Sequence, residues 1–330
     1  MKNLIRTISI ICILLIASCS KNQDVLTVYM PSEYIWLFKS GLISKFEADN
    51  DVKVKGIYFE GSSKIVVRLS LEKEYPKADI VMGLNQVSFL EADKLNLLEP
   101  YRPATYTKIK APGNTISPEF KATMFDFGGL AFIYDPEKIK IPLKSFEDIT
   151  KLKKSIVMPD PRTSTTGQDF LFWTIAVYGN NWLDYWKRLK GAIITITPDW
   201  NSCFAKFETG EAAMMVSYAS DEAFSIYTYK SDKYKVFIPE EGGYMEIEAN
   251  ALVRKKDIND KARKFIDFCL TDEVQQAIPL NNWMMPVTDV KLPEVFKYYR
   301  NPEKYKHIPN EELAADLQIW MNKWTELMTY

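Results

Sequence analysis

The octet Asp160-Pro161-Arg162-Thr163-Ser164-Thr165-Thr166-Gly167 carries several hydroxyl groups and lies between a run typical of a strand and one typical of a helix. Hydroxyl side chains at a helix start can cap it, and the first amides of a helix have no partner within it. Together with the helix dipole, such an end binds anions such as phosphate. Simple N-capping explains the same residues, so this stretch alone does not separate a structural role from anion binding.

Aromatic residues follow other expected strands of the chain. Trp200 comes after the strand-like run 193–197, Tyr218 begins the turn Tyr218-Ala219-Ser220-Asp221, and Trp283 lies in the segment 277–286. Open α/β sheets place their ligand residues at such strand ends. A flat aromatic cation gains about 0.5–2 kcal/mol from each ring that it contacts. Taken singly, each tryptophan is also explained by core packing.

The turn Glu60-Gly61-Ser62-Ser63 ends another expected strand. Its glycine allows close approach of the backbone to a ligand, the hydroxyls can donate, and Glu60 can accept from an amine. A Gly-Ser pair after a strand also marks an ordinary turn.

The elements that must position these residues alternate between strand and helix. Strands are expected at residues 25–29, 54–59, 78–82, 155–158 and 212–216, and helices at 65–71, 87–95, 168–177 and 182–189. This alternation predicts α/β lobes with parallel sheets covered by helices on both faces. Two long extended runs, 124–134 and 244–253, interrupt it about 110 residues apart. Two crossings between two lobes predict a hinged clamshell, with residues 19–125 and 246–290 in the first lobe and 126–245 and 291–330 in the second.

The N-terminus carries an export signal. Lys2 and Arg6 precede an apolar run from Ile8 to Ile16, which is too short to cross a bilayer. Ile16-Ala17-Ser18-Cys19 then has the form of a lipoprotein cleavage site. We therefore expect a signal peptide over residues 1–18 and lipidation of Cys19, with an uncleaved anchor or a plain secretory signal as the alternatives.

Composition excludes several function classes. The 42 basic and 43 acidic residues leave no basic stripe for nucleic acid. The single histidine, His307, argues against the usual zinc sites and a histidine base, so no metal or cofactor is expected. The remaining cysteines of the mature chain, Cys203 and Cys269, are expected to be two buried thiols, with a disulfide as the alternative.

Read together, these stretches resemble the bacterial thiamine-binding proteins of ABC importers. The similarity rests on the octet, the Trp200 segment, Ser217-Tyr218 and residues 277–286, and it extends over almost all of the mature chain. It implies a type II periplasmic-binding-protein fold and an interlobe cleft for thiamine, its monophosphate or its diphosphate. It also implies an ABC permease as partner, a monomer, and a location in the periplasm or on the outer face of the cytoplasmic membrane, held by lipid at Cys19. The ligand contacts that it implies fall on Glu60, Gly61, Ser62, Ser164, Thr165, Trp200, Tyr218, Ala219, Ser220, Asp221 and Trp283.

Some positions depart from the family pattern. Thr166 stands where the family tends to have proline, Pro31 where it has a tyrosine near the ligand, and Phe224 where it has another tyrosine. Tyr34 and Trp36 are the candidates to replace the ring missing at Pro31. The preferred vitamer therefore stays open.

Three rival functions remain open at this point. A thiaminase-like enzyme of the same fold would need Cys203 or Cys269 as an exposed nucleophile. A ferric-ion carrier would use a tyrosine pair such as Tyr298-Tyr299, which is more simply a docked helix surface. A polyamine carrier would need cleft carboxylates, which Glu60, Asp126 and Asp221 could supply.

Overall fold

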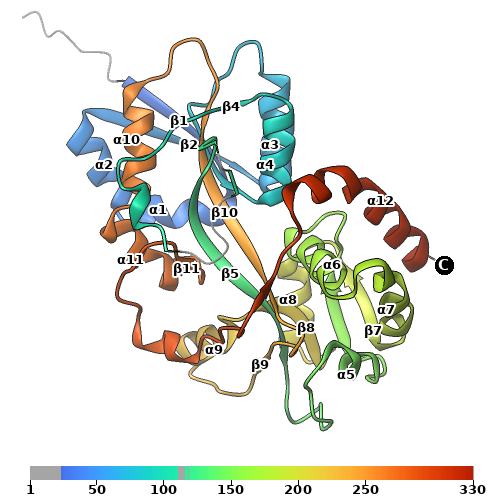
Figure 1. The fold of residues 1–330 in the computed structure, drawn as a ribbon. Helices are drawn as coiled ribbons and strands as arrows, with labels where there is room; N and C mark the ends of the chain where they lie inside the picture. The colour runs from blue at the N-terminus through green and yellow to red at the C-terminus, as the bar shows by residue number, and fades with distance from the viewer. Residues whose placement is uncertain (1–23, 111–115, 118, 330) are drawn as a thin grey trace, which may run out of the picture.

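A computed structural model of the chain describes residues 24–110, 116, 117 and 119–329. The expected signal peptide and the expected lipidation site at Cys19 lie outside the described residues. No helix of the described chain is long and apolar enough to cross a membrane. The architecture is the expected α/β fold, two lobes joined by two long strands that run side by side (Figure 1).

The main strands form one continuous series in the order β2-β1-β3-β10-β5-β8-β6-β7. Their bounds are β1 24–31, β2 52–59, β3 80–84, β5 123–134, β6 156–159, β7 193–197, β8 214–218 and β10 243–253. Short strands complete the edges: β4 98–99, β9 235–237, β11 285–286 and β12 305–306. The prediction of parallel sheets holds for β2-β1-β3 and for β8-β6-β7. The two expected crossings, β5 and β10, run antiparallel to each other and to β8 and β3, because they carry the chain from one lobe to the other.

The first lobe packs helices on both faces of its sheet. They are α1 36–39, α2 42–50, α3 62–71, α4 86–94, α10 260–269 and α11 272–281. The helical stretch between β1 and β2 is divided, because Gly41 takes a positive φ of 82° between α1 and α2. One core, around Phe46, Phe125 and Phe265, lies on one side of the sheet. A second core, around Leu69, Phe89 and Phe127, lies on the other.

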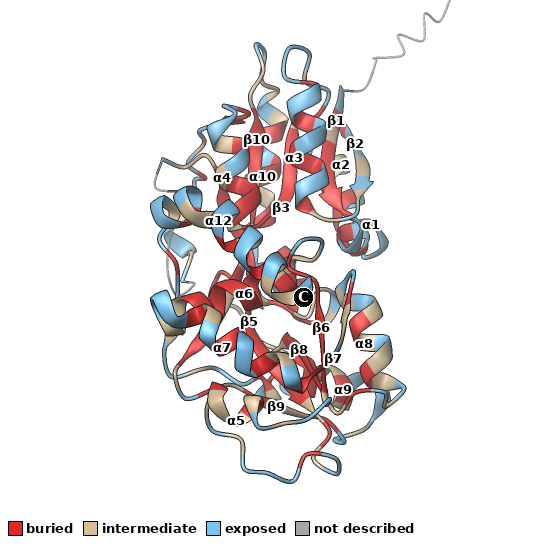
Figure 2. Cartoon of the chain, turned by 90° about the vertical axis from the view of Figure 1, so that its right-hand side faces the viewer, coloured by how far each residue is buried: buried red, intermediate tan, exposed pale blue. Residues whose placement is uncertain are grey.

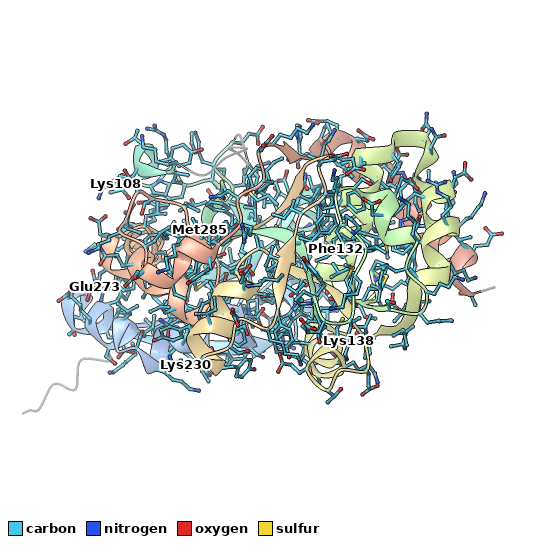
Figure 3. All side chains as sticks on the ribbon, turned by 90° about the horizontal axis from the view of Figure 1, so that it is seen from below. Lys108, Phe132, Lys138, Lys230, Glu273 and Met285 are labelled. Carbon is cyan, nitrogen blue, oxygen red and sulfur yellow. The ribbon has the colours of Figure 1, made fainter. Side chains whose placement is uncertain are left out.

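The second lobe has a more aromatic core. Its helices are α5 146–150, α6 165–178, α7 182–189, α8 200–208 and α9 221–229. Phe132 of β5 meets Phe170 edge-on and stacks on Trp173, with centroid distances of 5.5 and 5.7 Å. Figure 2 shows the strands of both lobes as the buried interior beneath helices that are exposed on their outer faces. Seen from below in Figure 3, Phe132 and Met285 lie inside, while Lys108, Lys138, Lys230 and Glu273 lie at the periphery.

The C-terminal helix α12, residues 310–329, joins the two lobes a third time. Its Trp324 meets Trp186 edge-on at 5.6 Å in the second lobe. Just before and at its start, the Ile308 carbonyl and the Asn310 side chain accept hydrogen bonds from Gln86 of α4, at 2.9 and 2.8 Å. This helix therefore contacts both lobes (Figure 1).

Candidate ligand site between the lobes

The octet begins α6 as predicted. Ser164 is the N-cap, and its Oγ accepts from the Gly167 amide at 3.5 Å. Thr163 Oγ donates to the Pro198 carbonyl, and Asp160 holds Arg162 through a bidentate ion pair, so these three side chains are engaged in structure. The amides at the start of α6 keep their orientation along the helix axis without intrahelical partners, which is the geometry of an anion site.

Thr166 connects this helix to the neighbouring strand. Its hydroxyl lies 2.8 Å from Tyr218 Oη at the end of β8, and Tyr218 in turn donates to Glu246 of β10. Trp200, the first residue of α8, donates from Nε1 to Ser217 Oγ at 2.9 Å. The octet, the Trp200 segment and Tyr218 therefore meet at one edge of the second lobe.

The three residues after Tyr218 are buried and hold the backbone of this turn. Ala219 and Ser220 are fully buried, and the Ala219 amide donates to the Gly129 carbonyl of β5. Asp221 accepts from the Tyr218 amide at 3.3 Å, and burial raises its pKa to about 6. These three residues hold the end of β8 in place, whereas Tyr218 keeps a half-buried ring.

The Glu60 turn faces this edge from the first lobe. Gly61 takes a φ of 86° as the N-cap of α3, and Ser62 behind it is buried. Glu60 is exposed and pairs with Lys64, which lowers its pKa, while the charge of Asp199 raises it. Because Asp199 is the N-cap of α8, this interaction places the turn opposite the start of α8.

An array of rings extends from the second lobe to Trp283. Trp200 stacks on Phe204 at 4.9 Å, Phe204 meets Phe224 at 6.0 Å, and Phe224 meets Trp283 edge-on at 5.1 Å. Phe296 covers one face of Trp283, with ring planes 10° apart. Trp283 follows α11 of the first lobe, so rings from both lobes form one array.

A cluster of buried carboxyl groups lies beside these rings. It consists of Asp126 on β5, Glu246 and Glu248 on β10 and Asp169 on α6, and we call it the carboxylate cluster. Asp126 lies directly across from Glu248 in the β5–β10 ladder, and Glu246 lies two residues away on the same face. Asn282 Nδ2 donates to Asp126 at 2.8 Å and to Glu248 at 3.3 Å. Burial raises the pKa of all four groups.

Sequence reasoning named only Asp126 of this cluster, as a possible polyamine contact. The available signal was three acidic residues inside two otherwise apolar extended runs. Their convergence depends on the register between β5 and β10, which the sequence does not specify.

Of the two candidates to replace the ring missing at Pro31, Tyr34 lies nearer the cluster. It is fully buried, and burial, together with the charges of Asp126 and Glu248, raises its pKa well above its usual range. Tyr34 and Trp36 both lie in the apolar core of the first lobe, and both are buried.

The two cysteines are buried free thiols, as expected. Burial raises the pKa of Cys203 to about 12 and that of Cys269 further, so neither is an activated nucleophile. Within the described residues, no group of histidine, cysteine and acidic side chains could hold a metal ion.

This fold and site define a solute-binding protein of bacterial transport. The sequence profile of the bacterial extracellular solute-binding proteins matches residues 41–299, and the chain belongs to that family, a transport component rather than an enzyme. Among its relatives, the thiamine-binding periplasmic protein of Brucella abortus is 32% identical over 327 residues, 96% of each chain. That of Escherichia coli K12 is 31% identical over 92% of this chain and 93% of its own.

Solved structures agree on the fold. A periplasmic thiamin binding protein superposes with a TM-score of 0.84 at 30% identity, covering 94% of this chain and 98% of its own. The ferric binding protein of Campylobacter jejuni superposes with a TM-score of 0.78 at 22% identity, covering 92% and 99%. At that identity the second comparison supports only the fold, the periplasmic-binding-protein fold predicted from the sequence.

Proposed function

We propose that this protein captures thiamine, or its mono- or diphosphate, between its lobes and delivers it to an ABC importer. The observation that carries the proposal is the array of rings from both lobes, which suits a flat aromatic cation. Relatives named for thiamine binding, matched over nearly the whole chain, support the same ligand.

In this proposal the start of α6 receives the phosphate of an ester. The amides beside Ser164 and Thr165 point toward that end, and the helix dipole favours an anion there. Trp200, Tyr218 and Trp283 contact the two rings of the ligand, and the Gly61-Ser62 turn approaches from the first lobe. Glu60 and the turn residues Ala219, Ser220 and Asp221 complete the proposed site, the last three by positioning Tyr218.

The departure at Phe224 is compatible with this ligand. Phe224 loses a hydroxyl but keeps an edge-on contact with Trp283, so the array stays continuous. Near Pro31, the ring of Tyr34 is fully buried and packs against Phe125 at 5.6 Å.

Capture works by closure of the lobes about β5 and β10. We propose that residues 19–125 with 246–290 move against residues 126–245 with 291–330, and that a ligand touching both lobes stabilises the closed form. An ABC permease then recognises that form. Lipidation of Cys19 after cleavage of residues 1–18 holds the monomer at the membrane surface, in the periplasm or on the outer face of the cytoplasmic membrane.

Calorimetry with thiamine and its phosphates tests the ligand. Trp200→Ala should weaken binding of every form about tenfold or more, because it removes a stacking surface. Ser164→Ala should weaken phosphate esters more than free thiamine, because it loosens the start of α6. Equal losses for both forms would exclude the phosphate role, and no thiamine binding by the wild-type protein would refute the proposal.

A further inference from the structure

The carboxylate cluster has an unusual charge balance. Asp126, Asp169 and Glu246 are buried and Glu248 is partly buried in one region, and among the described residues no lysine, arginine or histidine forms an ion pair with any of them. Two other buried acids do pair with cations: Glu222 with Lys235 at 3.0 Å, and Glu72 with Arg68 at 2.6 Å. Burial of carboxylates without a partner is costly, so this arrangement requires an explanation.

The carboxyl groups of the cluster lie close together. Asp126 and Glu248 are cross-strand neighbours, a position where like charges repel. Glu246 accepts from Tyr218, which belongs to the proposed ligand site. A Cβ on Gly128, opposite Glu246, would lie 3.4 Å from the Tyr218 ring, so the ring covers this face of the strands.

Two oxygens of the cluster lack a partner. Asp126 is fully buried and Asp169 is 6% exposed, and Oδ1 of Asp126 and Oδ2 of Asp169 have no hydrogen-bond partner among the described residues. Burial and then the charge of Asp169 raise the pKa of Glu246, and α6, which carries Asp169, packs against β10. A buried acceptor without a donor, next to a second carboxyl, is a site where a cation would be stabilised.

We propose that Asp126, Asp169, Glu246 and Glu248 form the counter-charge of the ligand site and select cationic over neutral ligands. The proposal rests on the proposed function for the identity of the ligand, but it makes a separate claim about charge. The thiazolium ring of thiamine carries a fixed positive charge, and the closed lobes would place it within reach of these carboxyls.

Binding of a cation should therefore release protons. In the empty protein, burial and mutual repulsion favour the protonated carboxyls, and a cation favours the ionised ones. The groups facing the cluster are Glu33 and Tyr34 before α1, Tyr218 on β8, Tyr244 on β10 and Asn282 after α11. None of them is a cation, so affinity for a cation should rise with pH, tenfold per unit for each proton released.

The experiment compares thiamine with an uncharged analogue in which carbon replaces the thiazolium nitrogen. Wild-type protein should bind thiamine at least tenfold more tightly. Glu246→Gln keeps an acceptor for Tyr218 but removes a charge, and it should remove most of this preference while changing affinity for the neutral analogue less than twofold. Calorimetry in buffers of different ionisation enthalpy should show fewer protons released by the variant.

A purely structural role predicts another pattern. If Glu246 only held the fold, Glu246→Gln would weaken both ligands equally and lower the melting temperature. Under the proposal, the melting temperature of the empty variant stays about the same, because Gln replaces a carboxyl that the empty protein already holds without charge. Glu294→Gln, an exposed carboxyl paired with Lys297, is the matched control and should change neither measurement.

Spermidine separates this proposal from the proposed function. In one outcome, the wild-type protein binds spermidine but not thiamine, and Glu246→Gln loses spermidine binding. This outcome would refute thiamine as the ligand and support the selection of cations by charge. Equal affinity of wild-type protein for thiamine and its neutral analogue would refute the charge selection and leave the ligand standing. Binding of neither cation would refute both.

Discussion

Replacing Trp283 with alanine tests the ring array most directly. The indole contacts Phe296, Phe224 and Tyr227, with centroid distances of 6.0, 5.1 and 5.6 Å. Each aromatic pair contributes about 0.5–1.5 kcal/mol, so three pairs give about 1.5–4.5 kcal/mol. Trp283 is only half buried, and its positive φ of 57° strains alanine as much as tryptophan. We therefore expect the free energy of unfolding to fall by about 2–3 kcal/mol.

The effect on ligand binding should come in addition to this loss. One stacking contact with a cationic ring contributes about 1–2 kcal/mol, equivalent to a 5- to 30-fold weaker thiamine affinity. Phe296→Leu is the matched control: it removes the ring behind Trp283 and should lower stability while changing affinity much less. Chemical denaturation and calorimetry on both variants supply the two quantities. A folded Trp283→Ala protein with wild-type affinity would refute the reasoning, as would an equal loss of affinity in Phe296→Leu.

Three further predictions concern the backbone, the thiols and pH. A Cβ on Gly167 would lie 2.4 Å from the Pro159 carbonyl oxygen, so Gly167→Ala should lower the melting temperature by several degrees. Gly191 has open space around it, so Gly191→Ala should leave the melting temperature unchanged. Equal melting temperatures of the two variants would contradict this prediction. Cys203 and Cys269 should resist iodoacetamide at pH 8 in the native protein and react in denaturant, as read by mass spectrometry; rapid native labelling would contradict their burial. Asp221 has a pKa of about 6 in the folded protein against 3.8 unperturbed. The folded state thus holds this proton more tightly, so stability present at low pH is lost as pH rises from about 4 to 6. Denaturation of the empty protein at pH 5.5 and 8 should show the higher stability at pH 5.5. Higher stability at pH 8 would refute the raised pKa in the folded state.

The sequence predicted the strands and the lobe crossings well because both depend on local pattern. The runs 124–134 and 244–253 are apolar and extended, and they became β5 and β10 almost residue for residue. The octet was correctly placed at a helix start because capping chemistry is local. The fold class followed from this alternation of elements.

The parts that the sequence did not specify depend on pairing and burial. Glu246 and Glu248 read as ordinary polar positions of a half-exposed strand until the register placed Glu248 across from Asp126. Asp221 follows an aromatic residue at a strand end, which suggested a ligand contact. In the structure its carboxylate accepts a hydrogen bond from the Tyr218 amide. This contact depends on the conformation of the turn, which the sequence does not specify.

The position of α12 has a consequence for the order of folding. Trp320 and Trp324, within the last eleven residues of the chain, belong to the same buried cluster as Phe172 and Trp186. The first lobe likewise needs β10 and α10, which come after residue 242. Neither lobe can therefore complete its core while much of the chain is still being synthesised. For a chain that we propose to be exported, this delay keeps the polypeptide loosely structured until its C-terminus is available.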